Sequence, residues 1–428
     1  MRVWIIPMIY LAAAFALGQV LPRLEFAYAA HDLLGVSVAS AQACMSAVAS
    51  GMMSLTGIVF ALAFIMVQFS AVAYSPRLVR MFVGDKMLYH SIGVFSFTFY
   101  LAFLALAWVD RNGSGKIPNY TLLLVGLLLA VSMFLFVRMI PRVVDLQIAP
   151  VLRSIGDKGR EVIEACYQPL KPTQGAERGL KCIEAPRLAA PCRTIFYTGY
   201  PRMVTRLDTD ALVREARASG AVVAMACGVG DTLTDGHVIM RVDDATSGFS
   251  EENAVRAVHL GVERTVEQDP KYPIRMLVDI AIKALSPAVN DPTTAVQAID
   301  QIEDLLRRLI RKDLESAHIK DTHGDVRLIL LLPSWQDYLA LAFDEIRQFG
   351  ANSIQVVRRL RSALAELADI SPTAARAEIT RRYLEQLDLG VDLSSFDPED
   401  KQKAMQEDRQ GLGLSRPQRT RSTQAAAT

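Results

Sequence analysis

The stretch CMSAVASGMMSLTGIVFALAFIMVQFSAV, residues 44–72, decides the fold of this chain. It belongs to a longer run, residues 33–76, that contains no Asp, Glu, Lys, Arg or His. Because an α-helix needs about 20 apolar residues to cross the hydrocarbon of a bilayer, this run predicts a membrane-spanning helix. Its Ser, Thr and Gln residues are unusual for such a helix, since hydrocarbon tolerates polar groups only where they find partners.

Three further apolar stretches, residues 3–21, 92–109 and 120–140, are also long enough to span a membrane. The first could instead be a signal peptide, because Arg2 precedes it. We favour an uncleaved anchor, since residues 19–25 make a poor cleavage site. The sequence therefore predicts four membrane spans.

Lys and Arg near the ends of the spans predict their orientation. One side has a clear excess, which comprises Arg2, Arg77, Arg80, Lys86, Arg138, Arg142, Arg153, Lys158 and Arg160. The opposite side has only Arg23, Arg111 and Lys116. Since basic loops stay in the cytoplasm, we expect both termini, and the long region after the fourth span, to be cytoplasmic.

Composition separates this region from the spans, because most charged residues follow Asp145. The net charge of +1 argues against a nucleic-acid partner, which would require a basic excess. The five cysteines form no C-x-x-C pair, so we expect reduced thiols, and no cofactor or metal is indicated. The expected partner is the lipid bilayer.

Hydrophobic periodicity predicts a fold class of four transmembrane helices followed by an α+β region, mostly helical with a small β subdomain. The expected parts are a transmembrane domain (1–147), a connecting helix and loop (148–192), a β-rich subdomain (193–249), a helical domain (250–390) and a disordered tail (391–428). Within the helical domain, residues 251–268 are predicted to form the first helix. The tail is called disordered because it has almost nothing to bury.

On a helix, the second span gathers small and weakly polar residues on one face. That face contains the candidate pore-lining residues Ser50, Ser54, Gly57 and Gln68, together with Ala43, Ala47 and Ala61. Such a face can line a water-filled path, or it can let helices pack closely while hydroxyls bond back to the helix. Four spans are too few for a pore in one subunit, so the channel hypothesis includes a homo-oligomer.

Arg77 and Arg80 follow this span and are expected at the cytoplasmic interface. Positive-inside anchoring explains them, and a ring of cations at a pore mouth is the alternative.

A second informative stretch is ALSPAVNDPTTA, residues 284–295. Asn290 and Asp291 can cap a helix that Pro292 begins, with Thr293 and Thr294 beside its free N–H groups. These four residues are candidates for binding a small ion or anionic ligand. The alternative is an ordinary corner whose caps are satisfied locally.

Other motifs give little support for catalysis or metal binding. Residues 228–236 superficially suggest a phosphate loop, but they lack the required spacing, so a hairpin turn is favoured. The cluster of His318, Asp321, His323 and Asp325 is more typical of a polar loop than of a metal site. No catalytic constellation is found, so an enzyme is not expected.

The motifs SLTGIVF (54–60) and ALSPAVNDPTTA (284–295), with the order of four spans and a cytoplasmic region, resemble bacterial predicted membrane proteins grouped as domain of unknown function 2254. The resemblance implies an inner-membrane location in bacteria and carries no established activity. We therefore hold two hypotheses: an oligomeric channel or transporter with a cytoplasmic regulatory domain, and a membrane-anchored sensor or scaffold that binds a metabolite or protein.

Overall fold

The computed structural model describes residues 5–28, 35–69, 86–144, 147–170, 192–243, 248–314 and 318–413. These residues form two compact units, Met1–Pro150 and Val151–Thr428. Each unit has its own secondary structure and its own packing, and each is described by itself.

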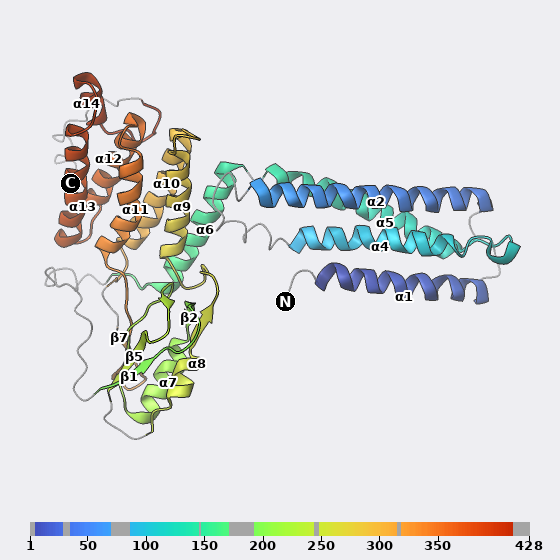
Figure 1. Cartoon of the computed structure of the whole chain (residues 1–428), viewed down its shortest axis with the longest axis horizontal. Coiled ribbons are helices and arrows are strands. Elements are labelled where there is room, and N and C mark those ends of the chain that lie inside the picture. The colour runs from blue at the N-terminus through green and yellow to red at the C-terminus, as the bar shows by residue number, and fades with distance from the viewer. Residues whose placement is uncertain are drawn as a thin grey trace, which may run out of the picture. The chain divides into compact units, whose positions relative to one another are not determined.

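Long apolar helices make up the first unit (Figure 1). They are α1 (Ile5–Tyr28), α2 (Val38–Phe69), α4 (Lys86–Leu106) and α5 (Asn119–Val144), with a short 3-10 helix, η3 (Arg111–Gly113), before α5. All four long helices have the length and hydropathy needed to cross a membrane. The predicted fold class is confirmed, because these helices precede a mostly helical region with small sheets.

Helix α4 packs against α1, α2 and α5. The packed helices enclose a hydrophobic core. Helix α2 contributes Val48, Met52, Leu55 and Val59 to this core, and these residues recur every three or four positions and are all buried. The outer surface of α5 is different in character, because it exposes large apolar side chains suited to lipid: Leu123, Leu127, Phe134, Val137 and Ile140.

The described strands of the second unit form a larger and a smaller sheet. The larger has the order β1-β5-β3-β8-β7, and its strands are β1 (Cys192–Phe196), β5 (Val238–Asp243), β3 (Val223–Met225), β8 (Val326–Ile329) and β7 (His318–Lys320). The smaller has the order β4-β2-β6, from β4 (Thr232–Leu233), β2 (Arg202–Leu207) and β6 (Val258–Gly261). Helices α7 (Thr209–Ser219) and α8 (Glu251–Arg256) accompany them. The β3–β8 pair is parallel and joins segments about a hundred residues apart in sequence.

In the described residues, the rest of this unit is helical (Figure 1). These helices are α6 (Ile148–Cys166), α9 (Lys271–Ala284), α10 (Pro292–Leu309), α11 (Trp335–Phe349), α12 (Ile354–Asp369), α13 (Ala374–Asp392) and α14 (Pro398–Ala404). Helix α9 packs on α10 and α11, and α12 packs on α10 and α13. Gly159 lets α6 approach these helices closely, because a Cβ there would lie 2.7 Å from Leu305.

One predicted helix, residues 251–268, is wrong. Helix α8 ends at Arg256, and β6 pairs with β2 directly afterwards. Ala254, Ala257 and Val258 are buried at spacings that imitate a helix, but strand pairing with β2 determines the structure.

The predicted disorder from residue 391 is also wrong as far as residue 413. Helix α13 continues to Asp392, and Asp397 caps α14. Beyond α14, the buried carboxylate of Asp408 accepts hydrogen bonds from three backbone N–H groups, those of Gln410, Gly411 and Gly413. One carboxylate therefore orders a segment that has few apolar residues, whereas residues 414–428 lie outside the described chain.

Candidate functional site

The predicted small and polar face of α2 lies on the exposed surface of the first unit. Ser50, Ser54, Gly57 and Gln68 are all exposed, as are the three alanines that share the face. At 100° per residue this face is opposite the one that packs on α4. The path that the sequence suggested therefore does not run between the packed helices of one chain.

Hydroxyl groups on α2 bond to their own helix. Ser54 Oγ donates to the carbonyl of Ser50 over 3.1 Å, and Thr56 Oγ1 donates to that of Met52 over 2.7 Å. Such bonds lower the cost of a hydroxyl in an apolar environment, as the packing alternative requires. Beside the face lies a groove of about 350 Å³, formed by α2 with α5 and lined by Ala47, Val48, Gly51, Met52, Ser54, Leu55, Ile58, Leu129 and Met133.

The first unit also contains a polar contact that sequence reasoning missed. Glu25 is buried at the end of α1, and its carboxylate accepts bonds from the N–H groups of Tyr120 and Thr121, at 3.0 and 2.8 Å. A carboxylate is favourable at the N-terminus of a helix, where N–H groups lack partners. Glu25 therefore caps α5 from the part of α1 that lies beyond the apolar stretch ending at residue 21.

Arg77 and Arg80, the predicted interface residues, lie outside the described part of the chain.

At the α9–α10 corner, Asp291 caps α10 as its sequence suggests. One carboxylate oxygen accepts the N–H of Thr294 over 3.1 Å, and the other accepts its hydroxyl over 2.6 Å. Asn290, at φ 49°, and Thr293 are exposed. The structure therefore brings Asp291 and Thr294 together in a local cap, whose negative charge opposes an anion at this helix end.

In the glycine-rich connection at residues 228–236, backbone N–H groups already have hydrogen-bond partners within the protein. Gly228 N–H donates to Asp231 Oδ2, and Gly230 N–H donates to the carbonyl of Val204. Arg264 and Lys271 donate to carbonyls of the same connection. Strands β3 and β5, which flank the connection, are antiparallel neighbours in the larger sheet. The connection is more than a hairpin turn, because it contains β4, which pairs with β2 in the smaller sheet.

The segment around His318 forms a hairpin, since His318 begins β7. Asp321 Oδ1 accepts the N–H groups of His323 and Asp325, and its other oxygen lies 2.8 Å from Arg327 Nε. Across the described residues, no three His, Cys, Asp or Glu side chains are arranged to hold a metal ion.

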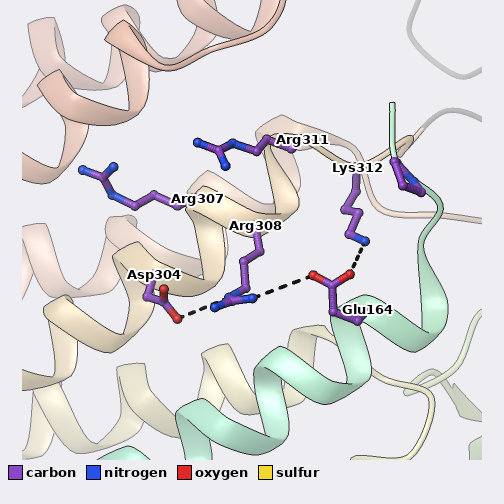
Figure 2. A pocket seen from close by; sticks show the side chains of 7 residues that line it. Glu164, Asp304, Arg307, Arg308, Arg311 and Lys312 are labelled. Atoms are coloured by element: carbon purple, nitrogen blue, oxygen red, sulfur yellow. Dashed lines mark hydrogen bonds and ion pairs between the residues drawn. The ribbon is translucent and has the colours of Figure 1, made fainter. Parts of the chain in front are cut away.

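The second unit contains a charged cavity of about 430 Å³ (Figure 2). Helix α6 supplies Glu164, and the end of α10 with the turn after it supplies most of the other lining residues, which are Pro169, Asp304, Arg307, Arg308, Arg311 and Lys312. Lys312 is buried, and its Nζ lies 2.5 Å from Glu164. Four cationic groups thus face two carboxylates. The sequence shows the basic residues between 307 and 312, but it does not show that α6 closes a cavity over them.

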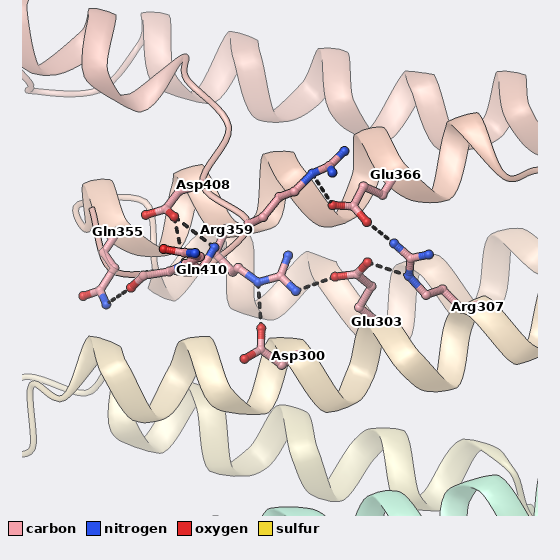
Figure 3. A network of polar contacts seen from close by, with 10 residues as sticks. Asp300, Glu303, Arg307, Gln355, Arg359, Glu366, Asp408 and Gln410 are labelled. Atoms are coloured by element: carbon pink, nitrogen blue, oxygen red, sulfur yellow. Dashed lines mark hydrogen bonds and ion pairs between the residues drawn. The ribbon is translucent and has the colours of Figure 1, made fainter. Parts of the chain in front are cut away.

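A network of ion pairs joins α10 to α12 next to this cavity (Figure 3). Arg359 Nε lies 2.7 Å from Asp300, and the same guanidinium bonds to Glu303. Glu303 also bonds to Arg307, which in turn contacts Glu366. Buried charges need such partners, so this network fixes the guanidinium of Arg307 at one edge of the cavity.

Comparisons with known proteins agree with the membrane-helix architecture. The family described as "Predicted membrane protein (DUF2254)" matches residues 1–366. Similar proteins include the uncharacterized protein Rv1290c of Mycobacterium tuberculosis and the uncharacterized protein Mb1321c of Mycobacterium bovis. Each is 26% identical over 386 residues, which cover 86% of this chain and 71% of the relative. No solved structure matches the chain.

Proposed function

Since the chain belongs to the DUF2254 family of predicted membrane proteins, we propose that it is an oligomeric channel or transporter of the bacterial inner membrane. In this proposal the second unit is its cytoplasmic regulatory part. The observation that carries the proposal is the polar face of α2, which lies at the surface of the bundle while the other face of α2 packs on α4.

A polar face on a spanning helix needs a partner other than hydrocarbon. Ser50 and Ser54 lie within the candidate span Val38–Ile65, where a hydroxyl group loses its hydrogen bonds to water if it faces acyl chains. Large apolar side chains cover the exposed face of α5, such as Leu127 and Phe134, and fit lipid well. Helix α2 also exposes Phe60, Phe64 and Ile65, which fit lipid, whereas its stripe of Ala47, Ser50 and Ser54 presents small and hydroxyl groups, and this supports contact of that stripe with water or with α2 of another subunit.

A homo-oligomer supplies both environments. When copies of α2 surround an axis, their small residues permit close approach and their hydroxyl groups face a shared path. The positive-inside distribution orients the assembly with both termini in the cytoplasm, and the proposed bilayer partner follows from the same spans.

Ion flux through reconstituted liposomes tests the proposal. The wild-type chain should conduct, and the combined Ser50→Leu and Ser54→Leu changes should block flux, because isobutyl groups would fill the path. Met53→Leu is the matched control, since Met53 is the adjacent residue, is 66% exposed and lies outside the polar face. Correctly inserted wild-type protein that passes no common cation or anion would contradict the proposal.

The alternative is a membrane-anchored sensor or scaffold, in which the spans only hold the second unit at the membrane. The charged cavity between α6 and α10 favours this alternative, because a sensor needs a place for its ligand. A sensor should keep its function after Ser50→Leu and Ser54→Leu, whereas changes at Asn290 or Asp291, or at the cavity, should abolish it.

A further inference from the structure

The cavity between α6 and α10 has more cationic donors than its own carboxylates can satisfy. Arg311 is exposed, and its guanidinium makes no ion pair or hydrogen bond with the described residues. Arg308 lies 3.5 Å from Asp304 and 3.9 Å from Glu164, both longer than the 2.7–2.9 Å typical of a charge-assisted hydrogen bond. Two guanidinium groups at this site therefore have hydrogen-bonding capacity to spare.

The need to neutralise the end of α10 does not explain this surplus. Arg376 of α13 is buried, and its Nη1 donates to the carbonyl of Ile310 over 2.6 Å and to that of Lys312 over 2.9 Å. The carbonyl groups that follow α10 thus already have a cation from another helix. The basic side chains that line the cavity are additional to that cap.

The turn that carries Arg311 is held in place before any ligand arrives. Leu170 N–H donates to the carbonyl of Arg311 over 2.9 Å, and Asp313 N–H donates to that of Gln168 over 2.8 Å. These two bonds connect the turn to the segment that follows α6. A site with a fixed backbone loses less entropy when it binds a ligand.

We propose that this cavity binds a phosphate-bearing anion, with Arg308 and Arg311 as its principal donors. The planar guanidinium fork matches the oxygens of phosphate, and two forks can hold one phosphate group from two directions. The cavity volume of about 430 Å³ is in the range of small-molecule sites. Lys312 remains paired with Glu164, and Arg307 remains in its network, so both shape the site rather than bind the phosphate (Figure 2).

Two sources can supply this chemistry, a free phosphorylated metabolite and the headgroup of an anionic lipid. Both present phosphate oxygens to the same pair of arginines. The inference does not depend on ion conduction, because it concerns binding to the second unit alone.

Calorimetric titration with inorganic pyrophosphate tests the site, using the full chain in nanodiscs of phosphatidylcholine at low ionic strength. Wild-type protein should bind, and Arg311→Gln should raise the dissociation constant about tenfold or more, as expected for loss of a charge-assisted bond. Since Arg311 is exposed, its replacement should leave folding intact. Arg256→Gln is the control, because Arg256 lies on α8, is 72% exposed and does not line the cavity.

Nanodiscs doped with phosphatidylglycerol distinguish the two sources. If a lipid headgroup occupies the cavity, phosphatidylglycerol should weaken pyrophosphate binding to the wild type, and Arg311→Gln should remove that difference. If the natural ligand is a free phosphate compound, any weakening by the negatively charged lipid surface should be the same for the wild type and for Arg311→Gln. Absence of pyrophosphate binding to the wild type in phosphatidylcholine, or equal weakening by Arg311→Gln and Arg256→Gln, would overturn the proposal.

Discussion

Gly230 is in a conformation that other residues rarely adopt, and it has no space for a side chain. Its φ is +91°, and a Cβ would lie 2.5 Å from Asp269 Oδ2 and 2.7 Å from Arg264 Nη2. Gly236, in the same connection, has a φ of +82° but open space around it. Alanine substitutions at these two glycines therefore separate the free-energy cost of the backbone conformation from the cost of steric overlap.

We expect Gly230→Ala to lower the free energy of unfolding by more than Gly236→Ala does. Gly236→Ala, the control, should cost about 1–3 kcal/mol, the usual cost of a strained backbone conformation. Gly230→Ala should cost more, because its methyl group would also displace Asp269 and Arg264. Chemical denaturation of the two variants in detergent measures both. Equal losses would mean that the surrounding side chains move aside without cost.

Asp321 gives the β7–β8 hairpin a pH dependence. The hydrogen bond from Arg327 lowers the pKa of Asp321 from 3.8 to about 2, and the N–H groups of His323 and Asp325 act in the same direction. Because the folded state favours the charged carboxylate, this stabilisation is present above about pH 4 and is lost as the pH falls towards 2. Amide-exchange protection in residues 318–329 should therefore fall over that interval.

Arg327→Gln is the matching variant for Asp321. It should flatten the pH dependence of exchange protection, because the main cause of the pKa shift is gone. An unchanged profile in this variant would assign the pH dependence to other groups.

At the scale of elements, buried ion pairs hold α10 against α12. The side chain of Arg359 is 7% exposed, and it bonds to Asp300 and Glu303. Arg359→Gln should destabilise the second unit by about 3 kcal/mol, because the buried carboxylate of Glu303 loses one of its two arginine partners and the half-exposed Asp300 loses its partner. Arg382→Gln, which removes a 58% exposed arginine paired with Glu378, should cost less than about 1 kcal/mol. Thermal unfolding measures both, and similar losses would refute a structural role for this network (Figure 3).

The exposed face of α2 makes its own prediction. If copies of α2 meet in an oligomer, Ser54→Cys should form disulfide-linked dimers on oxidation in the membrane, in a Cys44→Ser background. Phe134→Cys on α5, at a position 64% exposed, should stay monomeric because that face meets lipid. Cross-linking at residue 134 and none at 54 would place the subunit contact on α5 instead.

Sequence patterns predicted elements best where burial in an apolar environment alone determines them. The four spans are recognisable by their length and apolar composition, and the structure contains helices at those positions. Strand β6 and α14 were missed because both depend on distant or polar partners, β2 for the former and a capping Asp397 for the latter. The Asp291 cap could be predicted from the sequence, because Asp directly before Pro favours the start of a helix. Its carboxylate accepts the N–H of Thr294, only three residues further along the chain.

At the scale of the whole molecule, the charged cavity could not be predicted from sequence. Residues 164–169 and 304–312 are separated by more than a hundred positions, and no local pattern relates them. The run of basic residues at the end of α10 is visible, but it is equally typical of an ordinary helix C-terminus. Only the position of Arg376, which already caps the end of α10, distinguishes a surplus of cations from a helix cap.

The proposed topology puts the connection between α4 and α5 on the opposite side of the membrane from the second unit. Ser114 is exposed in that connection, and Cys192 is an exposed native thiol at β1. In spheroplasts, a membrane-impermeant maleimide should therefore label Ser114→Cys at once, and it should label Cys192 only after the membrane is permeabilised. Immediate labelling of Cys192 alone would reverse the orientation. Immediate labelling of both positions would mean that the chain does not cross the bilayer between them, because an intact membrane excludes the reagent from one side.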